Sequence, residues 1–306
     1  MLYISNSSLG TLSSCPRRFM YQYADAKRQD TMATLVGTAM HQAVQEWALT
    51  GDRDKAYHAL MYAYPFDKYL EETNASKAKR SINSCMMALD AAMDGISYSG
   101  LKLMTINDKP ANELDFALVL KSTELHYPLC YTGSIDSIFL QPWNERILVC
   151  DYKTTTRNVE LTNKMYSNSN QAIMYALILS AALGIKPTDV DYQYALIEMT
   201  DKIPQFQMQA KAITEEAVSE AIATIKTYAL WIESMLDAMF FPKNSSDCIN
   251  FNRICPHYDG CTAGASYSNE VYRTMLNRIM SEEPEYRYTY LGSDKTDYDL
   301  KGEIII

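Results

Sequence analysis

Apolar residues recur at helical spacing through the first part of the chain, and this period predicts a helical N-terminal region. The helices are expected at 7–26, 31–49, 52–70 and 74–94. The period then changes, and alternating or continuous apolar runs predict strands. The strands are expected at 113–121, 125–140, 146–154, 191–199 and 205–211. Further helices are expected over 168–183, ending at Gly184, and from Thr214 toward Phe240. The order α, β, α, β, α predicts an α/β fold, a mixed sheet with helical cover.

Length and composition are typical of a globular protein. The chain has 306 residues, of which 47% are hydrophobic and 21% are charged, so a core of normal size can form. The N-terminus has no basic patch followed by an apolar run, unlike a signal peptide. The apolar run over 172–183 is shorter than the roughly twenty residues of a membrane span. We therefore expect a soluble, cytoplasmic protein without a membrane partner.

The net charge of −9 is unevenly distributed. Residues 281–306 contain seven acidic and three basic residues, so we expect an acidic C-terminal tail after a single domain over 1–280. Net charge governs solubility and long-range attraction more than local grooves, so it does not exclude a nucleic-acid partner. Basic clusters that could meet phosphates occur at Arg17/Arg18, Lys27/Arg28 and Lys77/Lys79/Arg80.

Two neighbouring strands carry acidic residues in apolar surroundings. Asp151 and Lys153 are two apart at the end of a buried strand, so their side chains share one face. The hairpin partner, joined through residues 141–145, carries Asp136. Carboxylates on neighbouring strands repel unless a cation lies between them, and oxygen ligands suit Mg²⁺. The strand spacing alone is equally consistent with two turn aspartates and a surface lysine.

Two helices add candidate residues. His41 lies in Gly37-Thr-Ala-Met-His41, near the start of an amphipathic helix. Gln171 and Tyr175 are four apart, hence on one helix face, at the head of the helix that follows the Asp-x-Lys strand. Each of these features by itself carries little information, because a lone helical histidine is usually a packed or exposed residue.

In chain order the sequence shows SSCPRRFMYQY, GTAMH, GSID, DYK and QAIMY. This set resembles the RecB-type branch of the PD-(D/E)XK nucleases, which includes the nuclease domains of AddB and RecB and CRISPR-associated RecB-like iron–sulfur exonucleases. The resemblance implies a restriction-endonuclease-like mixed sheet flanked by helices. It also implies that His41, Asp136, Asp151 and the Tyr152 carbonyl bind Mg²⁺ or Mn²⁺, and that Lys153 is catalytic.

The same resemblance implies roles for three more residues. Gln171 and Tyr175 match a motif thought to contact DNA and order the site. Glu113 resembles an acidic residue at the start of the preceding strand in relatives and joins the catalytic set.

Four cysteines form a second candidate site. Cys248, Cys255 and Cys261 fall in one loop, over 248–261, and Cys15 precedes Pro16. Four thiolates can hold a tetrahedral Zn²⁺ or a [4Fe–4S] cluster, and their spacing does not separate the two. The resemblance favours the iron–sulfur cluster, as a clasp between the first helix and the end of the domain. Relatives commonly have a two-residue gap where six residues separate Cys248 from Cys255.

The function expected from these features is a metal-dependent DNA exonuclease that processes DNA ends in recombination, repair or phage DNA metabolism, in a bacterial or phage-infected cell. A helical insert over 50–95 would guide a strand, and Arg17 and Arg18 would bind DNA. One alternative is a DNA-end-binding adaptor with little nuclease activity that acts with a recombinase or CRISPR integration partner. Another is a zinc-stabilised structural protein.

Overall fold

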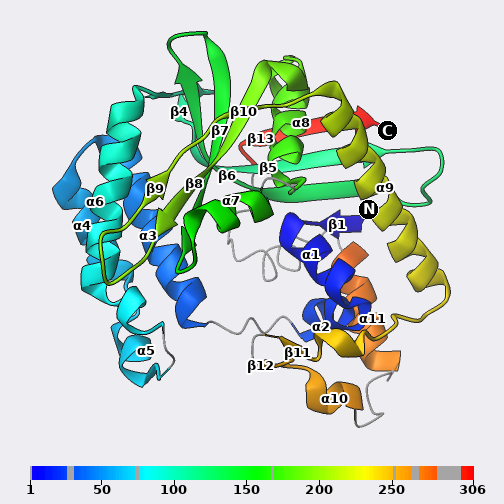
Figure 1. Cartoon of the computed structure of the whole chain (residues 1–306). Helices are drawn as coiled ribbons and strands as arrows, with labels where there is room; N and C mark the ends of the chain where they lie inside the picture. The colour runs from blue at the N-terminus through cyan, green and yellow to red at the C-terminus, as the bar shows by residue number, and fades with distance from the viewer. Residues whose placement is uncertain are drawn as a thin grey trace.

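The computed structural model describes residues 2–25, 31–73, 76–166, 169–250, 253–262, 269–280 and 298–306. A twisted mixed sheet forms its centre, with helices on both faces (Figure 1). The main path of the sheet runs β10-β8-β7-β6-β5-β13. Its long strands are β5 (Asn112–Lys121), β6 (Leu129–Gln141), β7 (Arg146–Thr155) and β8 (Val190–Glu198). The α/β mixed sheet with helical cover is confirmed.

The N-terminal segment forms a short strand and two helices. β1 (Leu2–Ile4) pairs parallel with β6. The single helix expected over 7–26 is instead α1 (Asn6–Ser14) and α2 (Pro16–Asp25). Cys15 between them is extended, with φ −157° and ψ 104°. The break follows from Pro16, which lacks a backbone N–H and disfavours a helical residue before it.

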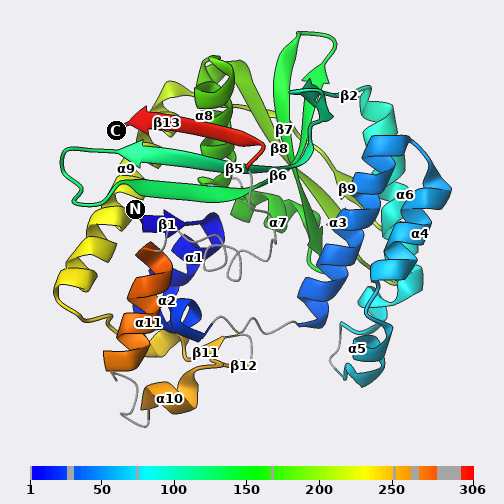
Figure 2. The same ribbon diagram turned by 180° about the vertical axis from the view of Figure 1, so that it is seen from behind.

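A helical module covers one face of the β7–β8 half of the sheet (Figure 2). It contains α3 (Met32–Thr50), α4 (Arg53–Ala63), α5 (Phe66–Glu71), η1 (Ala78–Arg80) and α6 (Ile82–Ser99). The helix expected over 52–70 is divided at Tyr64 and Pro65, and the next begins at Ile82. Buried side chains of α3 and α6 pack against Leu148, Cys150 and Tyr152 of β7. This packing fixes α3 beside the strand that carries Asp151.

The opposite face is covered by helices from the second half of the chain. α7 (Val159–Tyr166) and α8 (Gln171–Leu183) connect β7 to the parallel strand β8. α8 is buried over most of its length and ends before Gly184, which has φ 71°. α9 (Glu215–Asp237) starts at the expected cap, Thr214, whose side chain accepts a hydrogen bond from Ala217 N. The strand expected over 205–211 is two short ones, β9 (Phe206–Gln207) and β10 (Lys211–Ala212).

The remaining elements are short or lie near the C-terminus. They are β2 (Lys102–Leu103), β3 (Thr105–Ile106), β4 (Lys109–Pro110), η2 (Pro187–Asp189), η3 (Ser245–Asp247), β11 (Ile249–Asn250), β12 (Arg253–Ile254), α10 (Tyr258–Thr262) and α11 (Asn269–Met280). Over the described residues, no helix combines the length and the apolarity that a membrane crossing requires.

The C-terminal residues differ from the expected acidic tail over 281–306. β13 (Leu300–Ile305) joins the central sheet, parallel to β5, with Leu300 opposite Phe116. A Cβ atom on Gly302 would lie 2.5 Å from the Cβ of Ala181 in α8, so glycine permits the close approach of strand and helix. Residues 281–297 of the predicted tail lie outside the described residues. The prediction of an acidic tail was wrong for residues 300–305, because an excess of acidic residues does not indicate whether a segment pairs with a strand of the sheet.

Candidate active site

The candidate site lies where β6 and β7 separate. Their ladder ends at the pair Ser137–Cys150, so the next positions in register are Asp136 and Asp151. In place of a further ladder bond, the Tyr152 N–H donates to Asp136 Oδ2 at 2.7 Å. Asp136 is 7% exposed and Asp151 is 3% exposed. The fork therefore holds two buried aspartates side by side, as the hairpin register predicts.

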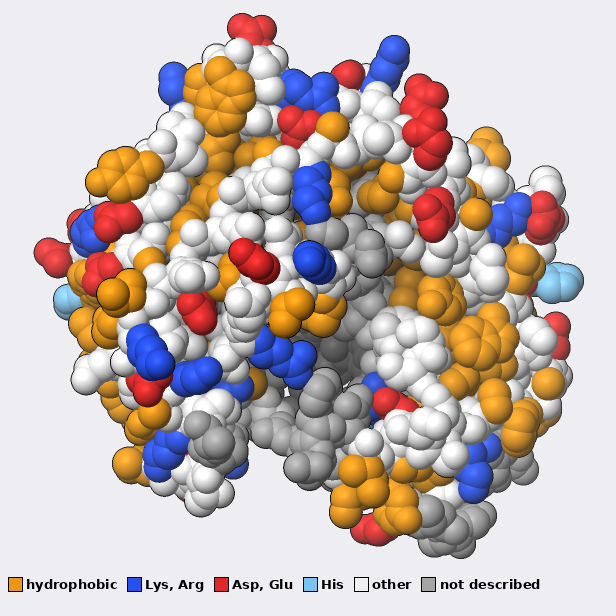
Figure 3. Space-filling model, in the orientation of Figure 1, with side chains coloured by type: hydrophobic (Ala, Val, Ile, Leu, Met, Phe, Trp, Pro, Cys, Tyr) orange, Lys and Arg blue, Asp and Glu red, His pale blue; other side chains and the backbone are white. Residues whose placement is uncertain are grey.

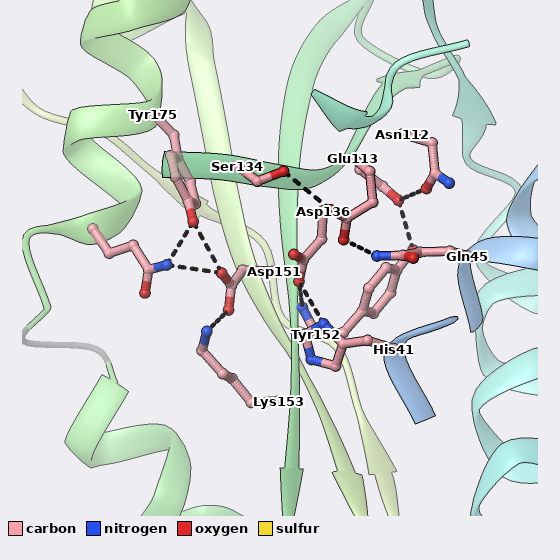
Figure 4. Close-up of polar contacts among 12 residues, drawn as sticks. His41, Gln45, Asn112, Glu113, Ser134, Asp136, Asp151, Tyr152, Lys153 and Tyr175 are labelled. Atoms are coloured by element: carbon pink, nitrogen blue, oxygen red, sulfur yellow. Dashed lines mark hydrogen bonds and ion pairs between the residues drawn. The ribbon is translucent and has the colours of Figure 1, made fainter. Parts of the chain in front are cut away.

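A third acid completes a row across three strands. Asn112 pairs with Ser137 and Leu114 with Ile135, so Glu113 stands opposite Asp136. Its φ of 51° is in the left-handed region, which non-glycine residues seldom adopt. The Glu113 carboxylate accepts hydrogen bonds from Gln45 Nε2 and, at 3.1 Å, from Ser134 Oγ (Figure 4). Glu113, predicted from resemblance alone, thus lies in the same cluster as Asp136.

His41 approaches this row from α3. Its Nδ1 lies 3.6 Å from Asp136 Oδ2. Ligand atoms of His41, Glu113 and Asp136 all lie within 4.8 Å of one another, the one such triad found among the described residues. Burial, followed by the charge of Lys153, lowers the pKa of His41, so the imidazole is neutral and keeps a lone pair at neutral pH.

The electrostatics of the cluster match a cation site. Burial and, after it, the neighbouring Asp151 carboxylate raise the pKa of Asp136 well above its ordinary value. Buried carboxylates side by side are unfavourable without a positive charge between them. Oxygen ligands with one imidazole suit Mg²⁺ or Mn²⁺. The residues present therefore fit a divalent metal.

Lys153 and two residues of α8 surround Asp151. Lys153 Nζ forms an ion pair with Asp151 Oδ2 and lies 5.7 Å above the ring of Tyr166. Burial acts to lower the pKa of Lys153, but Asp151 and Asp136 outweigh it and raise the pKa above its ordinary value, so the ammonium stays charged. The Lys153 side chain remains 22% exposed, which leaves it accessible from solvent.

Gln171 and Tyr175 face inward, toward Asp151. Gln171 Nε2 and the Tyr175 hydroxyl donate to Asp151 Oδ1 at 3.1 and 3.2 Å. Tyr175 is 3% exposed, so the structure does not place it where DNA could reach it. The predicted ordering of the site matches this geometry, whereas the predicted DNA contact of Tyr175 does not, because a hydroxyl aimed at a buried carboxylate is turned away from solvent.

The two arginines expected to bind DNA have internal partners. Arg17 is 8% exposed, and its Nε donates to the Phe241 carbonyl at 2.6 Å. Arg18 forms an ion pair with Asp247 at 2.5 Å. The charge of this helix face predicted a phosphate contact. The Arg17 side chain is instead buried and hydrogen-bonded to the segment that follows α9.

The four candidate cysteines gather around one cavity. Cys15 lies between α1 and α2, while Cys248 and Cys255 flank the β11–β12 hairpin and Cys261 lies in α10. The Cys255 N–H donates to the Cys248 carbonyl at 2.8 Å. Burial raises the pKa of the Cys255 thiol. Cys85, Cys130 and Cys150, which do not belong to this group, are buried.

Sequence reasoning missed two polar partners at the site, Gln45 and Ser134. Gln45 is four residues after His41, so the helical period alone puts both on one face. Ser134 is two before Asp136 in the same strand. Neither stood out, because a glutamine or a serine has no distinctive pattern without its three-dimensional neighbours.

Figure 3 shows the molecular face hollowed between α7 and the α1–α2 pair, with both basic and acidic side chains along the margin of the hollow. The Lys79 ammonium of η1 donates to the Thr156 carbonyl, just beyond β7, at 3.1 Å. The helical module is thereby attached beside the strand that carries Asp151 and Lys153.

A mixed sheet whose central strands separate beside a row of acids, with an adjoining lysine, is the arrangement expected of a metal-dependent nuclease centre. Comparison with known families matches residues 3–262 to the PD-(D/E)XK nuclease superfamily. The chain belongs to this superfamily. Among solved structures, it is similar to a protein from Eubacterium rectale described as a candidate exonuclease, with 14% identity and a TM-score of 0.51, over 86% of this chain and 93% of that one. No curated protein matches the chain.

Proposed function

We propose that this protein is a Mg²⁺- or Mn²⁺-dependent DNA exonuclease. The observation that carries the proposal is the cluster of His41, Glu113 and Asp136 ligand atoms within 4.8 Å, with Asp151 and Lys153 adjoining it. The exonuclease assignment over an endonuclease rests on the resemblance to RecB-type nucleases and agrees with the name given to the Eubacterium rectale protein.

The residues divide the chemistry between them. His41, Glu113, Asp136 and Asp151 would hold the ion, together with the Tyr152 carbonyl. A bound divalent ion supplies activation of a water molecule and neutralisation of phosphate charge. Lys153, fixed by Asp151 and still solvent-accessible, orients the attacking water and stabilises negative charge on the phosphate. Gln171 and Tyr175 hold Asp151 in place through its Oδ1.

The proposed substrate is DNA with free ends, in recombination, repair or phage DNA metabolism. Basic side chains lie along the margin of the hollow in Figure 3, with acidic ones among them. The basic ones support this substrate, because phosphate contacts dominate affinity for nucleic acid. Of the two arginines proposed to bind DNA, Arg17 is buried, and Arg18, which lines the cysteine cavity, would have to exchange its ion pair with Asp247 for a phosphate.

We also propose a [4Fe–4S] cluster at Cys15, Cys248, Cys255 and Cys261. All four cysteines line one cavity, and four thiolates can hold either a Zn²⁺ ion or a [4Fe–4S] cluster. The resemblance to iron–sulfur RecB-like nucleases favours the cluster. Metal analysis and visible absorption of anaerobically purified protein would test it.

The nuclease proposal is tested on end-labelled linear DNA and covalently closed circular DNA with Mn²⁺ or Mg²⁺. We expect degradation of the linear DNA alone, and its loss in Asp151→Ala and Lys153→Ala proteins that remain folded by circular dichroism. Activity that survives both substitutions would overturn the assignment. Metal-dependent DNA binding without cleavage would point instead to an end-binding adaptor.

A further inference from the structure

Gln45 is a buried amide on a helix face that otherwise packs against the core. It is 9% exposed, and its neighbours Ala43 and Val44 are fully buried. A buried amide without a partner is costly. The partner of Gln45 is the Glu113 carboxylate, to which its Nε2 donates. Gln45 is therefore placed to act on Glu113, although it contributes no atom to the metal triad.

The Glu113 carboxylate needs such a partner because its backbone does not have an ordinary strand conformation. With φ 51°, Glu113 is in a region that persists only where surrounding contacts hold it. Gln45 binds one carboxylate oxygen, and Ser134 Oγ binds the other at 3.1 Å. Both donors come from elements other than the strand of Glu113, namely α3 and β6 (Figure 4).

The chemistry of an amide suits this task. A lysine or arginine at position 45 would neutralise the carboxylate and compete with a metal ion. An amide N–H directs the oxygen yet leaves its negative charge available. His41 and Gln45 are one helical turn apart, so a single helix would supply a ligand and the group that orients a second ligand.

We propose that Gln45 is a positioning residue that orients Glu113 toward the divalent ion and so sets the affinity of the site. This inference rests on the proposed metal-dependent function. Outer groups that orient a ligand typically change metal affinity about 10–100-fold when they are removed. The same loss is expected for Gln45→Met, which keeps the side-chain length and removes the donor.

The test is a titration of the full-length protein with Mn²⁺, following the electron paramagnetic resonance signal of the free ion. We expect Gln45→Met to weaken binding about 10–100-fold, and Gln42→Met, an exposed glutamine on the same helix, to leave it unchanged. Gln45→Asn retains the amide but shortens its reach, so it should also weaken binding. It serves as the second variant if Gln45→Met fails to fold.

A double-mutant cycle separates positioning from a general structural effect. If Gln45 acts through Glu113, Gln45→Met should cause no further loss in a Glu113→Gln background. An unchanged affinity in folded Gln45→Met, or an equal loss in both backgrounds, would overturn the inference. Wild-type protein that binds no Mn²⁺ would instead overturn the metal-dependent function, so the two failures are distinct.

Discussion

Replacing Asp136 by asparagine should stabilise the protein when no divalent metal is present. Asp136 is buried, and its carboxylate lies within 4.8 Å of a Glu113 ligand atom. At that distance two like charges repel by about 3 kcal/mol at an effective dielectric constant of about 20. An asparagine side chain removes this charge, and its oxygen can still accept the hydrogen bond from Tyr152 N–H.

Protonation limits the size of the effect. A carboxyl group that must take up a proton to fold at pH 7 costs at most about 4 kcal/mol, since its unfolded pKa is about 3.9 and each pKa unit is worth about 1.36 kcal/mol. Lys153 offsets part of the repulsion. We therefore expect a gain of about 1–3 kcal/mol, or roughly 2–6 °C in Tm.

The pH dependence has a definite sign. Burial and Asp151 raise the folded-state pKa of Asp136, so this group binds more protons in the folded wild type than in the unfolded chain. The contribution of Asp136 to stability therefore falls as pH rises above about 4. The advantage of Asp136→Asn should therefore be absent near pH 4 and largest above the raised pKa. Thermal unfolding in EDTA across this pH range measures it.

Divalent metal should reverse the order of stability. Mn²⁺ at about 1,000 times its Kd would stabilise the wild type by about 4.1 kcal/mol, and Asp136→Asn should lose most of this gain. The matched control is Asp191, also 7% exposed but paired with Arg146 and Gln141. Asp191→Asn should destabilise with and without metal. If Asp136→Asn in EDTA destabilises as Asp191→Asn does, the repulsion argument is refuted.

Three further outcomes are expected. Tyr175→Phe removes the hydroxyl that donates to Asp151. Single-turnover DNA cleavage should slow at least about tenfold, while the free energy of unfolding falls by only about 1 kcal/mol. An unchanged cleavage rate would contradict the role of Tyr175 in ordering Asp151. Cys255→Ser should abolish visible absorption of the anaerobic protein and lower its Tm, because a bound cluster contributes to folding free energy; a colourless wild type would refute the cluster. Gly302→Ala should destabilise by about 1–3 kcal/mol, since its Cβ would meet Ala181 at 2.5 Å; Gly10→Ala, where no atom lies within 4 Å, is the control.

Local patterns predicted most of the secondary structure. The expected strands over 113–121 and 146–154 match β5 and β7 closely. Two helix boundaries are observed as expected: α8 ends at Gly184 and α9 begins after Thr214. Both were predictable because a left-handed C-cap and a side-chain N-cap are properties of one or two residues. The predicted helices differ from the structure at two prolines. Apolar spacing alone predicts one continuous helix at each place, whereas the chain forms two helices, divided at Pro16 and at Pro65.

The sequence by itself determined the two-residue spacing of Asp151 and Lys153. The ordered motifs placed His41 with them, and the family resemblance alone pointed to Glu113. Tertiary structure decided what these residues do together. Only the register of β5, β6 and β7 aligns Glu113, Asp136 and Asp151 in one row, and only the packing of α3 brings His41 and Gln45 onto it. Other tertiary contacts bury Arg17 and Tyr175 and pair 300–305 with β5 in the sheet. Contacts between residues far apart in the chain depend on the whole core, which no local pattern of charge or polarity encodes.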